Sequence, residues 1–428
     1  MTDEKLIRGI GRLDLIAITI NSVIGAGIFG LPSKAAALIG ANSLFAFIGC
    51  AVVVALIVFC FAEVSSRFAA TGGAYLYAKE AFGSVVGFEV GWLFWLVRIT
   101  AFATNCNLLV SYLGLPKEGF TRIAVIAAVV LALTALNFVG VKSSARMINL
   151  FTVGKLVPLF AFAIVGLFFI EPANINFTAT PDSNSFANTI LILVYAFTGF
   201  EMAVVPSGEM KNPQKILPFA LLISIAIIAA LYILIQLVCI GTLPELAASE
   251  RPLADAAGKF LGTFGSGFII VGAIISISGN LNSLLLSASR VPFAMAEQKE
   301  LPQIFTRTHE NYKTPYISLF LTAIVMLIFT VQTSFLTALT ISTITRLFVY
   351  ATTCASLPVF RWKKDAPKAE FLAPLGVVAA ILSLALIAWL LWNVKPEEFT
   401  NVLIVAAVGL IVYFAYLFLG KARNQANQ

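Results

Sequence analysis

The sequence predicts an all-α integral membrane protein of about twelve transmembrane helices. The 428 residues are 60% hydrophobic and only 11% charged, whereas an ordinary soluble domain is roughly 25% charged. The apolar residues also fall into separate runs of about 20 residues, the length that crosses a bilayer as a helix. A third observation, glycine-rich interruptions in two of these runs, bears on what the protein does.

The expected spans follow one another with short connections. The longest connections, 242–264 and 292–314, have only about two dozen residues, so we expect a single transmembrane domain over residues 1–428 without a separate soluble domain. The spans are expected near 12–39, 43–66, 84–112, 121–140, 147–170, 187–207, 215–241, 265–291, 315–331, 335–357, 371–393 and 400–420.

The basic residues predict the orientation of these spans. Nineteen Lys and Arg fall on the side of the N-terminus and five on the other side. Basic residues next to short loops stay in the cytoplasm, so we expect both termini there and the protein in the plasma or inner membrane. This bias explains the net charge of +7, which therefore gives no reason to expect a nucleic-acid partner.

The sequence gives no sign of a metal or cofactor site. The single histidine, His309, lies in a basic loop. The cysteines all lie within expected spans and lack CxxC spacing, so we interpret them as small buried hydrophobic residues. They are Cys50, Cys60, Cys106, Cys239 and Cys354.

The first expected span is interrupted in its middle. After an apolar run that starts at Leu15, the chain meets Gly25-Ala26-Gly27 and then Pro32. Glycine lets the backbone unwind at little cost, and proline disfavours helix just before itself. Unwound backbone at membrane depth is tolerated only where it is buried in protein or lines a cavity. We therefore expect a ligand site over Ile24–Ile28.

A second interruption occurs in the sixth span, at Tyr195-Ala196-Phe197-Thr198-Gly199-Phe200-Glu201, with Pro206 and Gly208 following. Interrupted segments at corresponding positions of two halves are typical of secondary transporters built from inverted repeats. The spacing fits two repeats of five spans, about 12–170 and 187–357. Spans 371–393 and 400–420 would lie outside the repeats.

The run from Ile24 through Gly30 to Pro32 resembles the first-helix signature of the amino acid, polyamine and organocation transporter superfamily. Further motifs follow in the family's order at 71–75, 199–213 and 289–302. The bacterial amino acid permeases and the L-amino acid transporter-like exchangers are the branches that it is most similar to. The resemblance implies a 5+5 inverted-repeat, leucine-transporter-like fold with a central amino acid site.

The two interruptions suit a zwitterion. N–H groups at the start of the outer half-helix, near Gly25, Ala26 and Gly27, favour a carboxylate, and carbonyls at the end of the facing half-helix accept from an ammonium. The resemblance implies that Tyr195 stands where members of the family carry an aromatic gate over the substrate, and Thr198 would then face the substrate side chain. Close helix packing alone is the alternative. The expected substrate contacts are Ile24, Gly25, Ala26, Gly27, Ile28, Tyr195, Ala196, Phe197, Thr198 and Gly199.

Lys155 lies about a third of the way into the fifth span, where an ionisable side chain is a functional candidate by default. In similar transporters a lysine at this motif occupies the place of a sodium ion. It would reach the carbonyls near Gly25, with Ser276 and Asn280 as partners from the eighth span. Either proton release by this lysine or its permanent charge as a substitute for sodium fits the sequence, and a snorkelling lysine is the alternative.

Glu201 is a second candidate to bind a proton or an ammonium. Arg98 and Arg346 are the other charges deep in spans, and either could instead form a purely structural pair with Glu201. An arginine that faces the cavity without a partner would favour an acidic substrate. Four other charged residues lie nearer the ends of spans, so we expect them at the membrane interface. They are Asp14, Lys34, Glu63 and Glu89.

The sequence thus predicts a secondary active amino acid transporter that works by alternating access without sodium, either coupled to protons or as an exchanger. An amino acid sensor with the same pocket but no flux is an open alternative. A membrane-embedded enzyme is less favoured, because the expected spans hold neither a histidine nor paired aspartates. The expected partners are an amino acid, protons and the bilayer, and the oligomeric state stays open.

Overall fold

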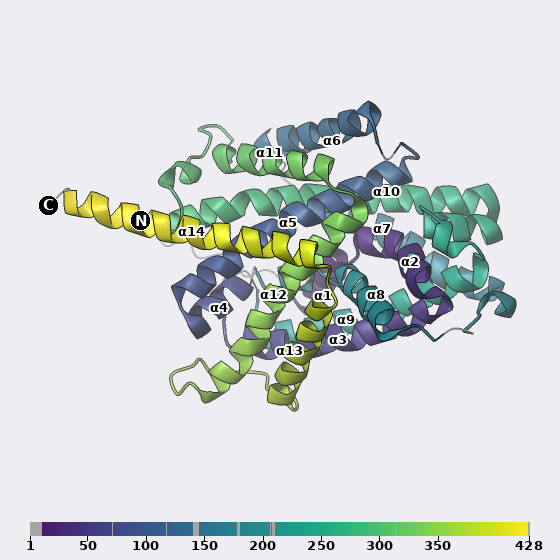
Figure 1. Cartoon of the computed structure of the whole chain (residues 1–428), viewed down its shortest axis with the longest axis horizontal. Coiled ribbons are helices and arrows are strands. Elements are labelled where there is room, and N and C mark those ends of the chain that lie inside the picture. The colour runs from purple at the N-terminus through teal and green to yellow at the C-terminus, as the bar shows by residue number, and fades with distance from the viewer. Residues whose placement is uncertain are drawn as a thin grey trace. The chain divides into compact units, whose positions relative to one another are not determined.

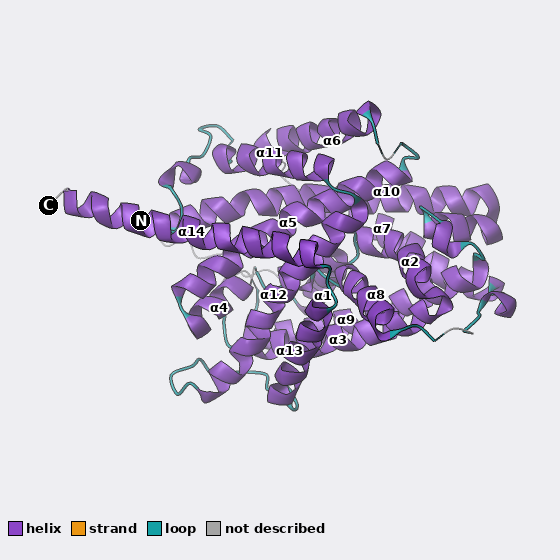
Figure 2. Cartoon of the chain, viewed as in Figure 1, coloured by secondary structure: helices purple, strands orange, loops and turns teal. Residues whose placement is uncertain are grey.

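The structure is a computed structural model, and it describes residues 11–70, 72–116, 118–139, 145–177, 180–205, 207, 210–312 and 314–426. Within these ranges every extended regular element is a helix (Figures 1 and 2). The α-helices are α1 (Arg12–Val23), α2 (Ala26–Ile39), α3 (Ser43–Ser65), α4 (Ala74–Phe82), α5 (Ser84–Tyr112), α6 (Phe120–Val139), α7 (Ala145–Gly166), α8 (Ser183–Ala196), α9 (Pro213–Thr242), α10 (Pro252–Glu297), α11 (Tyr316–Gln332), α12 (Phe335–Trp362), α13 (Gly376–Trp392) and α14 (Pro396–Ala426).

Eight helical stretches of the described chain are long and apolar enough to cross a membrane. Three further apolar helices, 154–169, α11 and α13, are shorter. The all-helical class is therefore confirmed, whereas the number of twelve spans and the inverted repeat stay predictions. The eight stretches are Ala26–Ser65, Ser84–Tyr112, Phe120–Val139, Ser183–Met202, Pro213–Thr242, Pro252–Glu297, Phe335–Trp362 and Pro396–Phe418.

Two helices differ from the expectation. The nine-residue helix α4 was not expected, because it is short and carries Lys79 and Glu80. Helix α10 has 46 residues and begins thirteen residues before the expected span at 265–291, within the connection expected at 242–264. It contains Gly262 at φ 61°, ψ −154°, so two helices meet at a bend that a residue without Cβ adopts readily.

The chain forms two compact units that interleave along the sequence. Unit 1 comprises residues 1–87, 158–269 and 347–394. Within it, α3 packs against α8, α9 and α13, α1 packs against α9, and α2 packs against α8. Large aromatic side chains such as Phe47, Phe61 and Tyr232 are fully buried in it. Unit 1 contains both expected interruptions.

Unit 2 comprises residues 88–157, 270–346 and 395–428. Within it, α6 packs against α11. The indole of Trp92 on α5 donates a hydrogen bond of 2.9 Å to the Val405 carbonyl on α14, and Asn137 on α6 donates one of 2.9 Å to Asn282 on α10. These polar contacts fix helix neighbours among surfaces that are otherwise apolar.

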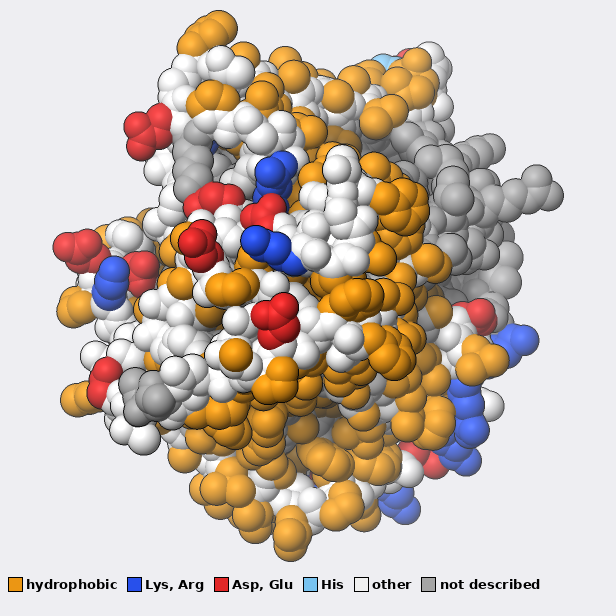
Figure 3. Space-filling view, turned by 90° about the vertical axis from the view of Figure 1, so that its right-hand side faces the viewer, with side chains coloured by type: hydrophobic (Ala, Val, Ile, Leu, Met, Phe, Trp, Pro, Cys, Tyr) orange, Lys and Arg blue, Asp and Glu red, His pale blue; other side chains and the backbone are white. Residues whose placement is uncertain are grey.

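Many large hydrophobic side chains are exposed, including Leu131, Phe264 and Ile411. Hydrophobic side chains cover much of the face in Figure 3, and the charged ones gather in a few groups. Contiguous apolar surface of this extent is unusual in soluble monomers. Together with the eight apolar helical stretches, it indicates a protein that crosses the membrane several times.

Candidate functional site

The first interruption lies at Ile24 and Gly25. Helix α1 closes with a hydrogen bond of 2.9 Å from the Ile24 N–H to the Ile20 carbonyl. Ile24 (φ −72°, ψ 99°) and Gly25 (φ −134°, ψ −152°) are extended, and α2 begins at Ala26. The first N–H groups of a helix have no earlier carbonyl in that helix to bond. The N–H groups of Ala26, Gly27 and Ile28 are therefore the ones that α2 offers to a ligand.

Pro32 does not end a helix, contrary to the expectation from sequence. It lies inside α2, which continues to Ile39. In α2 the proline follows a full turn that has already formed, and transmembrane helices tolerate proline where neighbouring helices pack closely around it. Gln236 on α9 is such a neighbour, because its side-chain amide lies 3.5 Å from the Pro32 carbonyl. The interruption lies at Ile24 and Gly25, before α2 begins.

The second interruption begins where α8 ends at Ala196. Gly199 has φ 120°, a value that side chains rarely allow, and the short 3₁₀ helix η4 (Phe200–Met202) follows. The Tyr195 carbonyl accepts two hydrogen bonds from Thr198, one of 2.7 Å from its hydroxyl and one of 3.2 Å from its N–H. The Tyr195 carbonyl thus already accepts hydrogen bonds, and the Thr198 hydroxyl turns back onto the end of α8.

The two interruptions pack against each other within unit 1. A Cβ added to Gly27 would lie 2.6 Å from the Ala196 Cα. A Cβ added to Gly199 would collide with the Ser22 carbonyl oxygen. Since real Cβ atoms do not approach backbone so closely, both glycines are required for the contact. The start of α2 and the end of α8 are therefore held side by side.

All ten residues that we expected to contact substrate are buried in the structure. The contact between the two interruptions brings helix N–H groups, with their partial positive charge, next to helix-end carbonyls, with their partial negative charge. Such a pair suits a small molecule that carries an acid group and an amino group. The sequence predicted the two interruptions, because glycine and the aromatic-rich run mark them.

The Glu201 side chain forms hydrogen bonds at the second interruption. Its Oε2 accepts hydrogen bonds of 2.8 Å from the Gly199 N–H and of 2.8 Å from the Tyr350 hydroxyl on α12. Phe61 and Phe200 pack around the Tyr350 ring, with centroids 5.5 Å and 5.2 Å away. The carboxylate therefore stabilises the turn at Gly199 and connects it to α12. Tyr350 was not expected from the sequence, since it lies 149 positions away.

Lys155 is 4% exposed and belongs to unit 2. The preceding Gly154 packs against Ile275, whose Cγ2 would be 3.3 Å from an added Cβ. Helices α7 and α10 are thus neighbours at Gly154, next to Lys155. This agrees with the expectation that Lys155 lies near the eighth span. The hydroxyl of Ser276 is buried and makes no hydrogen bond in the described part of the chain, so the expected bond from Lys155 to Ser276 is not formed. Asn280 is half-buried.

Arg98 and Arg346 are also buried in unit 2. The Arg98 guanidinium donates hydrogen bonds to the Ser287 hydroxyl at 3.0 Å and to the Phe94 carbonyl at 3.1 Å. It also lies 4.0 Å from the centre of the Phe94 ring, in the range of a cation–π contact. These contacts occupy Arg98 within its own unit, which argues against its role as a receptor for an acidic substrate.

Glu63 lies near the end of α3, as expected, but its side chain is fully buried in the protein. It accepts hydrogen bonds from Arg361 on α12 at 2.8 Å and 2.6 Å, and from Arg67 at 3.0 Å. The Ala373 N–H adds another of 3.0 Å. Arg67 is an i,i+4 neighbour of Glu63, whereas Arg361 lies 298 positions away and no local pattern could have revealed it.

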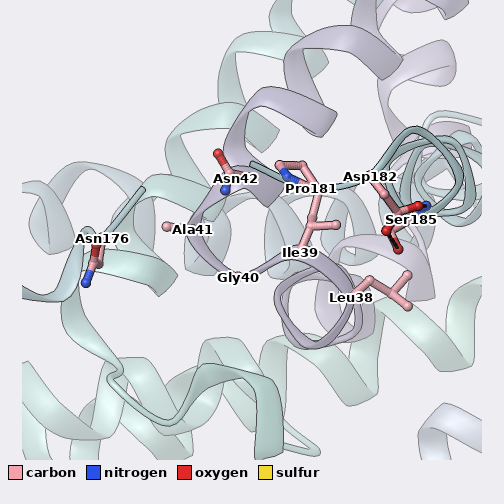
Figure 4. Close-up of a pocket in the computed structure, with 9 residues that line it drawn as sticks. All are labelled: Leu38, Ile39, Gly40, Ala41, Asn42, Asn176, Pro181, Asp182 and Ser185. Carbon is pink, nitrogen blue, oxygen red and sulfur yellow. Dashed lines mark hydrogen bonds between the residues drawn. The ribbon is translucent and has the colours of Figure 1, made fainter. Parts of the chain in front are cut away.

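A separate cavity of about 260 Å³ lies at the far end of α2, in unit 1 (Figure 4). It is away from both interruptions. Asp182 caps α8 there by accepting hydrogen bonds from the N–H groups of Asn184 at 3.0 Å and Ser185 at 2.9 Å. The cavity is lined by Leu38, Ile39, Gly40, Ala41, Asn42, Asn176, Pro181, Asp182 and Ser185.

The apolar helices define a multi-pass membrane protein, and two interruptions in its helices pack against each other. A family model described as amino acid permease matches residues 10–415, and the chain belongs to this family. The resemblance noted from the sequence motifs is thereby confirmed.

Several characterised bacterial transporters are similar along most of the chain. A methylthioribose transporter of Bacillus subtilis is 29% identical over 433 residues, covering 96% of this chain and 94% of the relative. The serine/threonine exchanger SteT of Bacillus subtilis is 32% identical over 331 residues, covering 74% and 75%. An arginine/agmatine antiporter of Chlamydia pneumoniae is 28% identical over 454 residues, covering 99% and 92%. The names describe transporters, and the family supports amino acid transport.

Proposed function

We propose that this protein moves an α-amino acid across the membrane by alternating access, independently of sodium. The observation that carries the proposal is the contact between the interruptions at Gly27 and Ala196. In this proposal the N–H groups of Ala26, Gly27 and Ile28 bind the carboxylate. The ammonium binds the carbonyls of Ala196 and Thr198, since the Tyr195 carbonyl is already occupied. Tyr195 closes over the substrate.

Lys155 supplies the positive charge that a sodium ion would otherwise bring, and Glu201 is the residue that can carry a proton. A lysine that stays charged gives an exchanger, whereas proton release from Lys155 or proton uptake by Glu201 gives coupling to protons. Relatives named as exchangers and antiporters support the first possibility. In the orientation that the basic residues favour, both termini lie in the cytoplasm.

Uptake and counterflow in proteoliposomes test this proposal. A panel of labelled amino acids is measured with the purified chain, with and without a proton gradient, and with potassium in place of sodium. We expect saturable flux of at least one amino acid without sodium. Exchange predicts counterflow that does not need the gradient, whereas symport predicts flux that follows it. Binding of an amino acid without any flux would refute transport and favour a sensor.

A further inference from the structure

The connection between α12 and α13 exposes apolar side chains beside lysines. We refer to residues 362–375 as the basic platform. Trp362 is 75% exposed, Leu372 is 65% exposed and Leu375 is 77% exposed. Lys363, Lys364 and Lys368 on the same segment are exposed as well. Exposed aromatic and aliphatic groups next to cations need a partner that is apolar and anionic at once.

The backbone of the basic platform is firmly attached to the end of α3. The Ala373 N–H donates to the buried Glu63 carboxylate at 3.0 Å, and the Phe371 N–H donates to the Ser66 hydroxyl at 3.2 Å. Arg67 donates to the Pro367 carbonyl at 2.9 Å. These bonds hold the segment in one conformation. Its apolar side chains are therefore presented outward by a fixed backbone.

Leu375 also indicates that the basic platform contacts a partner outside the chain. It has φ 52° and ψ 32°, the left-handed region that is uncommon for residues other than glycine. The hydrogen bond of 2.9 Å from the Ala379 N–H to its carbonyl starts α13. The chain thus accepts backbone strain at a leucine whose side chain makes little contact with the protein. A partner outside the chain would explain why a large apolar residue stands at this position.

The basic platform carries mostly positive charge when the acidic residues that form ion pairs are set aside. Glu370 lies 3.7 Å from Lys215, and Arg361 is bound to Glu63. Asp365 is then the remaining acidic residue against Lys363, Lys364 and Lys368. Lys363 also donates to the Glu80 carbonyl at 3.1 Å, which keeps its charge at this surface.

The place of the basic platform along the chain identifies the partner. It joins the apolar stretch that ends at Trp362 to the apolar helix that begins at Gly376, so it lies where hydrocarbon gives way to headgroups. Tryptophan concentrates at that level of a bilayer, and lysines there attract anionic lipids. We propose that the basic platform binds the headgroups of anionic phospholipids, with Trp362 and the two leucines inserted beside the acyl chains.

The lipid preference of the full chain tests this proposal. Detergent-purified protein is titrated with phosphatidylglycerol or phosphatidylcholine, and retained lipid is measured by native mass spectrometry. The test variant carries Lys363→Gln, Lys364→Gln and Lys368→Gln. The matched control carries Lys259→Gln, Lys299→Gln and Lys395→Gln, three lysines that are also exposed. We expect the preference for phosphatidylglycerol to fall roughly a hundredfold in the test variant, the size that three lysines contribute near an anionic surface, and to stay unchanged in the control.

Insertion of Trp362 is measured separately, by quenching tryptophan fluorescence with brominated phosphatidylglycerol in vesicles. The chain has five tryptophans, so Trp362→Phe is the reference. We expect this substitution to remove a quenched component that brominated phosphatidylcholine quenches less. Equal retention of both lipids by the unmodified chain would overturn the proposal, as would an equal loss in the test and control variants. Stabilisation by inorganic phosphate alone, equal to that by the lipid, would also overturn it.

Discussion

Gly27 lies against the backbone of Ala196, so close that a methyl group at Gly27 would come within 2.6 Å of the Ala196 Cα. This contact joins the start of α2 to the end of α8, the two places where helical N–H groups and carbonyls lose their partners. Gly199 makes the reciprocal contact with Ser22. The proposed substrate site depends on this pair of contacts.

Gly27→Val is expected to abolish substrate binding, because a branched side chain has no room beside Ala196 and separates the two interruptions. The measurement is the rise in melting temperature that a bound amino acid produces. Gly267→Val is the matched control, since an added Cβ there meets nothing within 4 Å. Substrate-dependent stabilisation of Gly27→Val equal to that of the unmodified protein would place the site elsewhere.

Lys155→Ala is expected to abolish or severely slow transport, since it removes the cation that we propose as the substitute for sodium. Initial uptake in proteoliposomes measures this. Lys395→Ala changes an exposed lysine and is expected to leave uptake unchanged. Flux of Lys155→Ala at the level of the unmodified protein, at every pH tested, would contradict the role of this lysine.

The substitution Glu201→Gln tests whether Glu201 carries the coupled proton or only stabilises the structure. Glutamine can still accept from Gly199 and Tyr350 but cannot ionise, so coupling through Glu201 predicts uptake that no longer follows the proton gradient. Tyr350→Phe removes one donor to the carboxylate and is expected to cost about 1.5–3 kcal/mol of stability if Glu201 is ionised. Uptake by Glu201→Gln that depends on the gradient as before would exclude this residue as the proton site.

Glu63→Ala is expected to lower the free energy of unfolding by about 3–5 kcal/mol, because Arg361 and Arg67 would lose a buried counter-charge. Lys34→Gln provides the comparison, since the pair of Lys34 and Glu250 is 3.5 Å apart and partly exposed; such a pair contributes about 0–1 kcal/mol. Thermal unfolding in detergent measures both variants. Equal effects would show that Glu63 is not a buried ion-pair partner.

The first turn of α8 is expected to open in acid. Hydrogen bonds from the Ser185 hydroxyl, and from the N–H groups of Ser185 and Asn184, hold the pKa of Asp182 below its ordinary value of 3.8. A lowered pKa means that this stabilisation is present above the ordinary value and is lost as the pH falls through the lowered one. Hydrogen exchange of residues 183–190, corrected for intrinsic rates, measures the opening. Asp182→Ala should remove the pH dependence, and protection that is unchanged in acid would refute it.

Much of the helical architecture could be predicted from the sequence because apolar runs and glycines act locally. Helix α5 begins and ends where expected, and the chain leaves the helix within a residue of Gly25. Pro32 was misinterpreted, because tertiary packing around α2 outweighs the local preference of proline. Glu63 and Tyr350 were missed as partners for a different reason: contacts between residues 149 or 298 positions apart leave no periodic signal.

Competition for counterflow shows whether the paired interruptions bind a zwitterion. A transported amino acid is compared with its decarboxylated amine, its N-acetyl derivative and methylthioribose, the cargo named for one relative. We expect only molecules with both a carboxylate and an ammonium to compete, and we expect Gly27→Val to abolish the flux. Counterflow driven by methylthioribose, with every amino acid inert, would contradict this expectation.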